Sequence, residues 1–132
     1  MASMRIVRMD IPMTFSPEYL EEEIRKTLAA NNLSDKAARV KLLVVRKAGG
    51  LYTPETNDID FLITTDELSV NTYLLNEKGL NIELYKDFYK NSGLLGTIKS
   101  TSAQLYTVAS IFRKENEYDE CLLINERKEV VE

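Results

Sequence analysis

The chain has 132 residues, of which 44% are hydrophobic, and its 17 Lys and Arg residues against 21 Asp and Glu residues give a formal net charge of −4. This acidic balance provides no basic field for a nucleic-acid backbone. The sequence holds no histidine and a single cysteine, Cys121, which excludes imidazole metal sites, histidine-dependent nucleophiles, internal disulfides and thiolate zinc sites. No apolar run reaches membrane-spanning length, so we expect a cytoplasmic protein without metal, nucleic-acid or membrane partners.

Two helices are predicted near the start of the chain. Met1, Met4 and Val7 recur at helical spacing without an N-cap before them, which is the pattern expected at the tail of a helix already under way. Ser16 is a competent N-cap and Pro17 suits the first helical position, so a second helix is predicted from this point. Its apolar stripe consists of Leu20, Ile24 and Leu28 and runs out near residues 31–32.

Two strands follow the second helix. Residues 39–46 are aliphatic on both faces, which favours a central strand, and residues 59–63 are predicted to form a partner strand. Residues 64–71 are polar and aperiodic, which is typical of a linker. The prediction is therefore a first domain over residues 1–66 and a second over residues 67–132.

The second half of the chain combines strands with one helix. Residues 79–85 alternate like a half-exposed strand. Ser100, Thr101 and Ser102 are possible N-caps for a helix that follows, which would place Lys99 just outside its N-terminus. The apolar face of that helix is predicted to consist of Leu105, Val108, Ala109 and Phe112. Residues 120–125, a polar turn at 126–128 and residues 130–131 then predict a hairpin.

The C-terminal third resembles a known family. Gly-Thr-Ile-Lys99-Ser-Thr-Ser, the helix, and the run from Asp119 to Glu132 are similar to the lysine-to-glutamate segment of the class IV aminotransferases. These fold-type IV enzymes use pyridoxal 5'-phosphate (PLP) and include branched-chain aminotransferases, D-amino-acid aminotransferases and 4-amino-4-deoxychorismate lyase. The separation of 132 − 99 = 33 residues is similar to that of the lyase branch.

The resemblance implies roles for both ends of this segment. Lys99 would hold PLP as a Schiff base and later move the α-proton of the substrate. Glu132 would lie against the pyridine nitrogen and keep the ring protonated, so that it acts as an electron sink. The family also implies a homodimer and a small-molecule amino acid or aminodeoxychorismate-like substrate.

An upstream segment extends the resemblance. Arg46, the following glycine pair and Tyr52 are similar to the Arg-Gly-Gly-Tyr loop of the lyase branch, which implies that Arg46 and Tyr52 contact the substrate. The alternative is an arginine that ends a strand before a glycine turn. Leu51 stands where the lyase-type loop usually carries a second arginine, and Gln104 stands where the branched-chain enzymes place a tyrosine. We interpret Tyr106 as a core residue of the helix, without a role toward the cofactor.

The fold class predicted from the resemblance is α+β. The chain would comprise the end of a small N-terminal α/β domain and the beginning of the larger C-terminal pseudo-barrel domain. The predicted function is amino-group transfer or pyruvate elimination, with the chain as an internal fragment that is inactive by itself because the family's phosphate-binding residues lie outside it. Two alternatives are a non-catalytic module that binds a protein through exposed strand edges and an unrelated small-molecule sensor domain.

Overall fold

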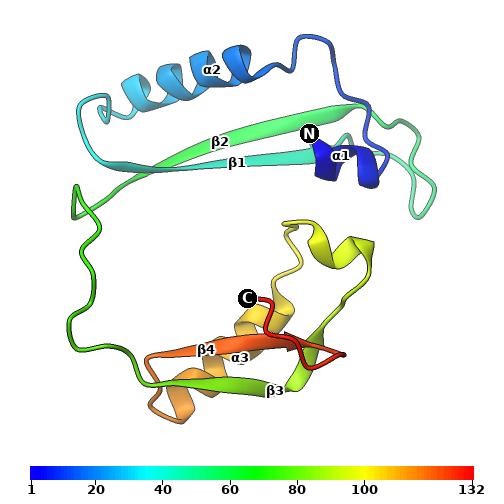
Figure 1. The fold of residues 1–132 in the computed structure, drawn as a ribbon. Helices are drawn as coiled ribbons and strands as arrows, with labels where there is room; N and C mark the ends of the chain where they lie inside the picture. The colour runs from blue at the N-terminus through cyan, green and yellow to red at the C-terminus, as the bar shows by residue number, and fades with distance from the viewer. The chain divides into compact units, whose positions relative to one another are not determined.

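The computed structural model describes all residues 1–132 and contains both helices and small sheets (Figure 1). The helices are α1 (Ala2–Ile6), α2 (Pro17–Ala30), the 3-10 helix η1 (Leu94–Thr97) and α3 (Gln104–Glu115). The strands are β1 (Ala38–Arg46), β2 (Ile59–Glu67), β3 (Ile82–Lys90) and β4 (Glu120–Asn125). The predicted α+β class is thereby confirmed. None of the helices combines the length and apolar character needed to cross a membrane.

The chain consists of two units, Met1–Leu74 and Leu75–Glu132. In the first unit, β1 and β2 pair antiparallel from Ala38↔Glu67 to Arg46↔Ile59. The buried core of this unit is formed by Met4, Phe15 and Ile59, against which Leu20, Val44 and Phe61 pack. The core therefore joins α1, the segment before α2, α2 itself and one face of the β1–β2 pair.

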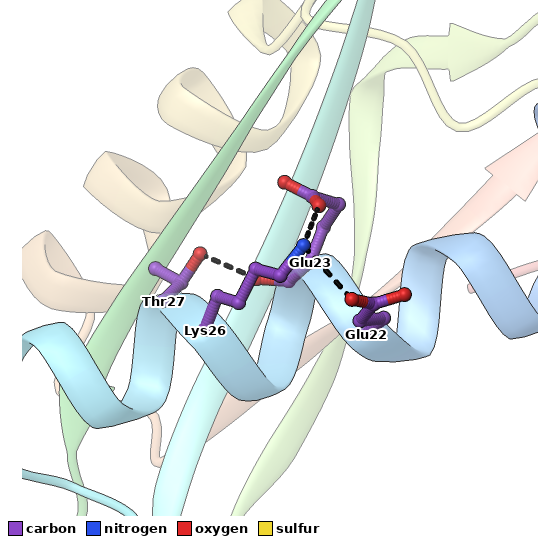
Figure 2. Close-up of polar contacts among 4 residues, drawn as sticks. All are labelled: Glu22, Glu23, Lys26 and Thr27. Atoms are coloured by element: carbon purple, nitrogen blue, oxygen red, sulfur yellow. Dashed lines mark hydrogen bonds and ion pairs between the residues drawn. The ribbon is translucent and has the colours of Figure 1, made fainter.

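Helix α2 begins as the sequence predicts. The Ser16 side-chain oxygen accepts a hydrogen bond from the Tyr19 backbone N–H at 3.2 Å, and Pro17 is the first helical residue. Figure 2 shows the polar side of the helix, where Lys26 Nζ lies 2.9 Å from Glu23 Oε1 and 3.0 Å from Glu22 Oε1. Such ion pairs within one helix stabilise it by only about 0.2–0.5 kcal/mol each. This side of α2 is therefore a solvent-exposed charged surface that adds little to stability.

Two strand predictions in the first unit need correction. The prediction that residues 39–46 form a central strand is wrong, because β1 and β2 form a two-stranded sheet. The aliphatic residues away from the core remain partly in solvent, with Val45 42% and Leu62 56% exposed. The predicted linker at residues 64–71 also begins too early, because β2 continues to Glu67 with polar side chains on a solvated strand. The domain boundary at residue 66 stays a prediction.

In the second unit, β3 and β4 pair in parallel, with Ile82 opposite Glu120 and Lys90 opposite Asn125. Parallel neighbours require a crossover connection, and α3 lies within it. The buried core consists of Tyr85, Ala109 and Leu123, with Leu105, Val108, Phe112 and Cys121 packed against it. The predicted apolar face of α3 is therefore confirmed.

The predicted hairpin after β4 is confirmed by an antiparallel bridge between Ile124 and Val130. Its turn is organised by the buried Asn125, whose Oδ1 accepts hydrogen bonds from the backbone N–H groups of Arg127 at 2.9 Å and Glu129 at 3.0 Å. This fixed turn returns the chain along β4 and determines where Glu132 lies.

Two further predictions in the second unit are wrong. The strand predicted at residues 79–85 begins at Ile82 and continues to Lys90. The N-cap of α3 is Ala103, without a side-chain cap, so none of Ser100, Thr101 and Ser102 has that role. The Ser100 hydroxyl instead accepts a hydrogen bond from the Ser102 N–H at 3.2 Å, which satisfies a local turn before the helix. Lys99 consequently stands five residues ahead of Gln104.

Candidate functional site

The candidate site is built around Glu132, which lies in the second unit. Glu132 ends the return segment, which is the stretch of residues 129–132 after the turn that follows β4. The Val131 N–H donates to the Leu123 carbonyl at 2.9 Å, and the Leu123 N–H donates to the Glu132 carbonyl at 2.7 Å. These bonds attach the return segment to β4. Because Leu123 belongs to the buried core, the backbone that carries Glu132 is attached to the core of this unit.

The Glu132 carboxylate contacts two side chains from other elements. Its Oε2 atom accepts a hydrogen bond from the Tyr106 hydroxyl at 2.6 Å and another from Lys90 Nζ. Lys90 Nζ also donates to the Tyr106 hydroxyl oxygen at 2.9 Å and lies 5.5 Å from the centre of its ring. Oε1 of Glu132 makes no hydrogen bond to the protein. The end of β3, the first turn of α3 and the return segment thus meet at one carboxylate oxygen.

The acid and the amine shift each other's pKa in opposite directions. The hydrogen bond from Lys90, followed by that from Tyr106, lowers the pKa of Glu132, while burial opposes the shift. The hydrogen bond to Glu132, followed by that to Tyr106, raises the pKa of Lys90. Both changes favour the ionised pair, so Glu132 is an anion and Lys90 a cation at neutral pH.

A cavity of about 500 Å³ lies beside this pair. The volume is within the range of about 300–1,000 Å³ that small-molecule sites occupy. Its lining includes the charged side chains of Lys90, Arg127, Glu129 and Glu132 together with the glycine-containing segment between β3 and η1. The cavity is therefore lined by both positive and negative side chains.

Lys99 lies on the exposed segment between η1 and α3 and does not line this cavity. Its side chain makes no hydrogen bond or ion pair with the protein. Its positive charge nevertheless contributes to lowering the pKa of Glu132, which places the amine within electrostatic range of that carboxylate. The segment thus supplies an unpaired amine, whereas the amine of Lys90 is bound to the acid.

Arg46 and Tyr52 belong to the first unit. The Arg46 guanidinium donates to the carbonyls of Val7 at 2.6 Å and Arg8 at 3.2 Å, and to the side-chain oxygen of Asn57. Tyr52 lies in the loop after β1, is 95% exposed and makes no side-chain hydrogen bond. The structure thus gives Arg46 a role in holding the chain together, and the substrate contacts of both residues stay a prediction.

Two residues of the candidate site, Tyr106 and Lys90, were not predicted from the sequence. Tyr106 is not a core residue, because it is 40% exposed and its hydroxyl reaches Glu132. Its position outside the apolar stripe of α3 was a signal for this placement. Lys90 carried no local signal, because Glu132 lies 42 residues further along the chain and the pairing of β3 with β4 brings the two together.

Comparison with known protein families identifies the family to which this chain is similar. A family model described as amino-transferase class IV matches residues 1–132, which is the whole chain. This match confirms the resemblance seen in the lysine-to-glutamate segment. No curated protein matches the sequence.

Proposed function

We propose, because this chain belongs to the class IV aminotransferase family, that it serves PLP-dependent amino-group transfer or the related elimination of pyruvate, with Lys99 as the lysine that binds the cofactor. The single observation that supports the proposal is an ionised carboxylate, Glu132, beside a cavity of about 500 Å³ and within electrostatic range of an unpaired lysine. When bound, PLP supplies a ring that withdraws electrons from the substrate's α-carbon.

The choice of Lys99 over Lys90 follows from their contacts. An amine must be neutral to attack an aldehyde. Lys90 is held as a cation by Glu132 and Tyr106, which raise its pKa, whereas Lys99 is exposed and its side chain makes no hydrogen bond or ion pair. Lys99 Nζ is therefore the proposed nucleophile, and once released it would also move the proton at the substrate's α-carbon.

Glu132 fits the other end of the cofactor. A pyridine nitrogen stays protonated when an anionic carboxylate accepts its N–H. Glu132 is ionised, and its Oε1 has no partner within the protein. We accordingly propose Glu132 as the group that holds the ring nitrogen.

The substrate would be a small amino acid or an aminodeoxychorismate-like molecule, by resemblance to the family, and the working protein a homodimer. Tyr52 offers a free phenol for such a contact. Arg46 would first have to exchange its bonds to Val7 and Arg8 for the substrate carboxylate. Tyr52 is for this reason the stronger of the two proposed substrate residues.

Reductive trapping tests the assignment of Lys99. The chain is incubated with saturating PLP, reduced with borohydride and digested, and the modified lysine is located by mass spectrometry. We expect the adduct on Lys99 and its loss in Lys99→Ala. Lys114→Ala, which removes an exposed lysine from the last turn of α3, serves as the matched control and should keep the adduct. An undiminished adduct in Lys99→Ala, or one spread evenly over all lysines, would refute the proposal.

A second candidate function is a non-catalytic module that binds a protein through strand edges. It is favoured by the two-stranded β1–β2 sheet, in which each strand has one edge without a strand partner. Light scattering after size exclusion, combined with amide exchange, tests it. A monomer whose outer-edge amides are already protected would argue against edge-mediated binding.

A further inference from the structure

Lys90 and Tyr106 bind the same oxygen of Glu132 and leave the other oxygen free. Both hydrogen bonds end on Oε2, at 2.6 Å for Tyr106, and no protein group donates to Oε1. We infer that Lys90 and Tyr106 are positioning residues, which hold Oε2 so that Oε1 remains the acceptor for the ring nitrogen of the cofactor. That the ring nitrogen of PLP donates to Oε1 rests on the proposed function, whereas the contacts of Lys90 and Tyr106 with Oε2 do not.

The contact differs from the surface ion pairs of this chain. The side chain of Lys90 is 22% exposed and that of Glu132 is 46% exposed, whereas in the pair Lys36–Glu67 the two side chains are 51% and 54% exposed, so the difference lies on the lysine side. Lys90 is also held from a second side, since its amine donates to the Tyr106 hydroxyl at 2.9 Å and lies over the tyrosine ring. A carboxylate with two donors on one oxygen has little freedom to rotate, so the direction of Oε1 is fixed before a ligand arrives.

The charges around Glu132 determine how the arrangement responds to pH. Lys90 binds it from β3 and Tyr106 from α3, Lys99 acts on it through its positive charge, and Arg127 and Glu129 line the same cavity. Lys90 and Tyr106 lower the pKa of Glu132 and thereby keep it ionised to lower pH. Oε1 can accept the ring N–H only while the carboxylate is ionised. Removing either donor should therefore move the acid limit of cofactor binding to higher pH.

The test measures PLP binding to the full chain across pH by equilibrium dialysis, alongside the titration of the Glu132 side-chain carbon by NMR. The variants are Lys90→Met, Tyr106→Phe and the rescue variant Lys90→Arg. Lys128→Met is the matched control, because Lys128 donates to the hydroxyl of Tyr89 at 3.0 Å in a similar pair that involves no carboxylate. The cofactor's own titration is the same in every variant and cancels in the comparison.

We expect Lys90→Met and Tyr106→Phe to raise both the pKa of Glu132 and the acid limit of binding. Lys90→Arg and Lys128→Met should leave both near the wild-type values. If the acid limit stays unchanged in Lys90→Met and Tyr106→Phe, the inference is overturned. Tyr106→Phe removes one oxygen from a partly exposed side chain, so it decides the matter even if Lys90→Met fails to fold.

The outcome also separates this inference from the proposed function. A wild-type chain that binds no PLP at any pH removes PLP as a ligand of this chain and the ring nitrogen as the donor to Oε1. The NMR titration then still decides whether Lys90 and Tyr106 hold the carboxylate. A chain that binds PLP through Lys99 but shows the same Glu132 titration in all variants keeps the function and refutes the positioning role.

Discussion

Replacing Arg46 should destabilise the first unit, because its guanidinium connects β1 to two other segments. It donates to the carbonyls of Val7 and Arg8 and to the side chain of Asn57. Arg8 has φ +56°, in the left-handed region, which costs about 1–2 kcal/mol for a residue other than glycine. The arginine therefore stabilises a conformation at the end of α1 that is unfavourable by itself.

The magnitude follows from the three contacts of Arg46. A hydrogen bond from a charged donor contributes about 1.5–3 kcal/mol when it is well shielded. Arg46 is only half-buried, and water can replace it at the partly exposed carbonyls of Val7 and Arg8, so each bond contributes less. We expect Arg46→Met, which keeps most of the aliphatic stem, to lower the free energy of unfolding by about 2 kcal/mol.

Urea unfolding followed by circular dichroism measures this change, with amide exchange of residues 1–10 as a local readout. Arg39→Met is the matched control, because Arg39 lies on the same strand, is exposed and makes no side-chain hydrogen bond or ion pair. It should change stability by less than about 0.5 kcal/mol. If Arg46→Met behaves like this control, the guanidinium contributes nothing to the fold and the residue is free to bind substrate.

Two further predictions concern stability. Leu123→Ala should lower the free energy of unfolding in urea by about 3 kcal/mol, because the side chain is 4% exposed within the core of the second unit. The control Leu95→Ala, at a residue that is 71% exposed, should lower it by less than about 0.5 kcal/mol. Equal effects of the two variants would contradict the assigned core. Ser16→Ala should cost about 1 kcal/mol by removing the N-cap of α2, while Ser16→Asp, which restores an acceptor for the Tyr19 N–H, should recover most of it. A loss that Asp fails to recover would show that the cap is not its cause.

The elements that the sequence predicted well are those with local signals. Ser16 and Pro17 define the start of α2 because a cap needs only groups within one helical turn. The face of α3 was predicted because Leu105, Val108 and Ala109 repeat at the helical period and all contact one core. The Lys99–Glu132 segment was identified by its spacing, and the family match over residues 1–132 supports that identification.

The errors concern features that depend on distant partners. Aliphatic residues on both faces of β1 suggested a central strand, yet the number of strands in a sheet is decided by pairing that residues 39–46 do not encode. β3 was predicted to end at Tyr85, because alternation stops there, but pairing resumes between Lys90 and Asn125 after an irregularity in the register. That resumed pairing brings Lys90 to the candidate site.

The two lysines near Glu132 show why the site needed coordinates. In sequence, Lys90 and Lys99 are both charged residues near glycines, and only Lys99 stood in a recognisable segment. In the structure, the amine bonded to Glu132 is that of Lys90. The hydrogen bond to Glu132 raises the pKa of Lys90 and keeps its amine protonated. A protonated amine cannot act as a nucleophile, but it can hold the Glu132 carboxylate in place. The contact with Glu132 is thus consistent with the proposed division of roles, in which Lys90 holds the acid and Lys99 binds the cofactor.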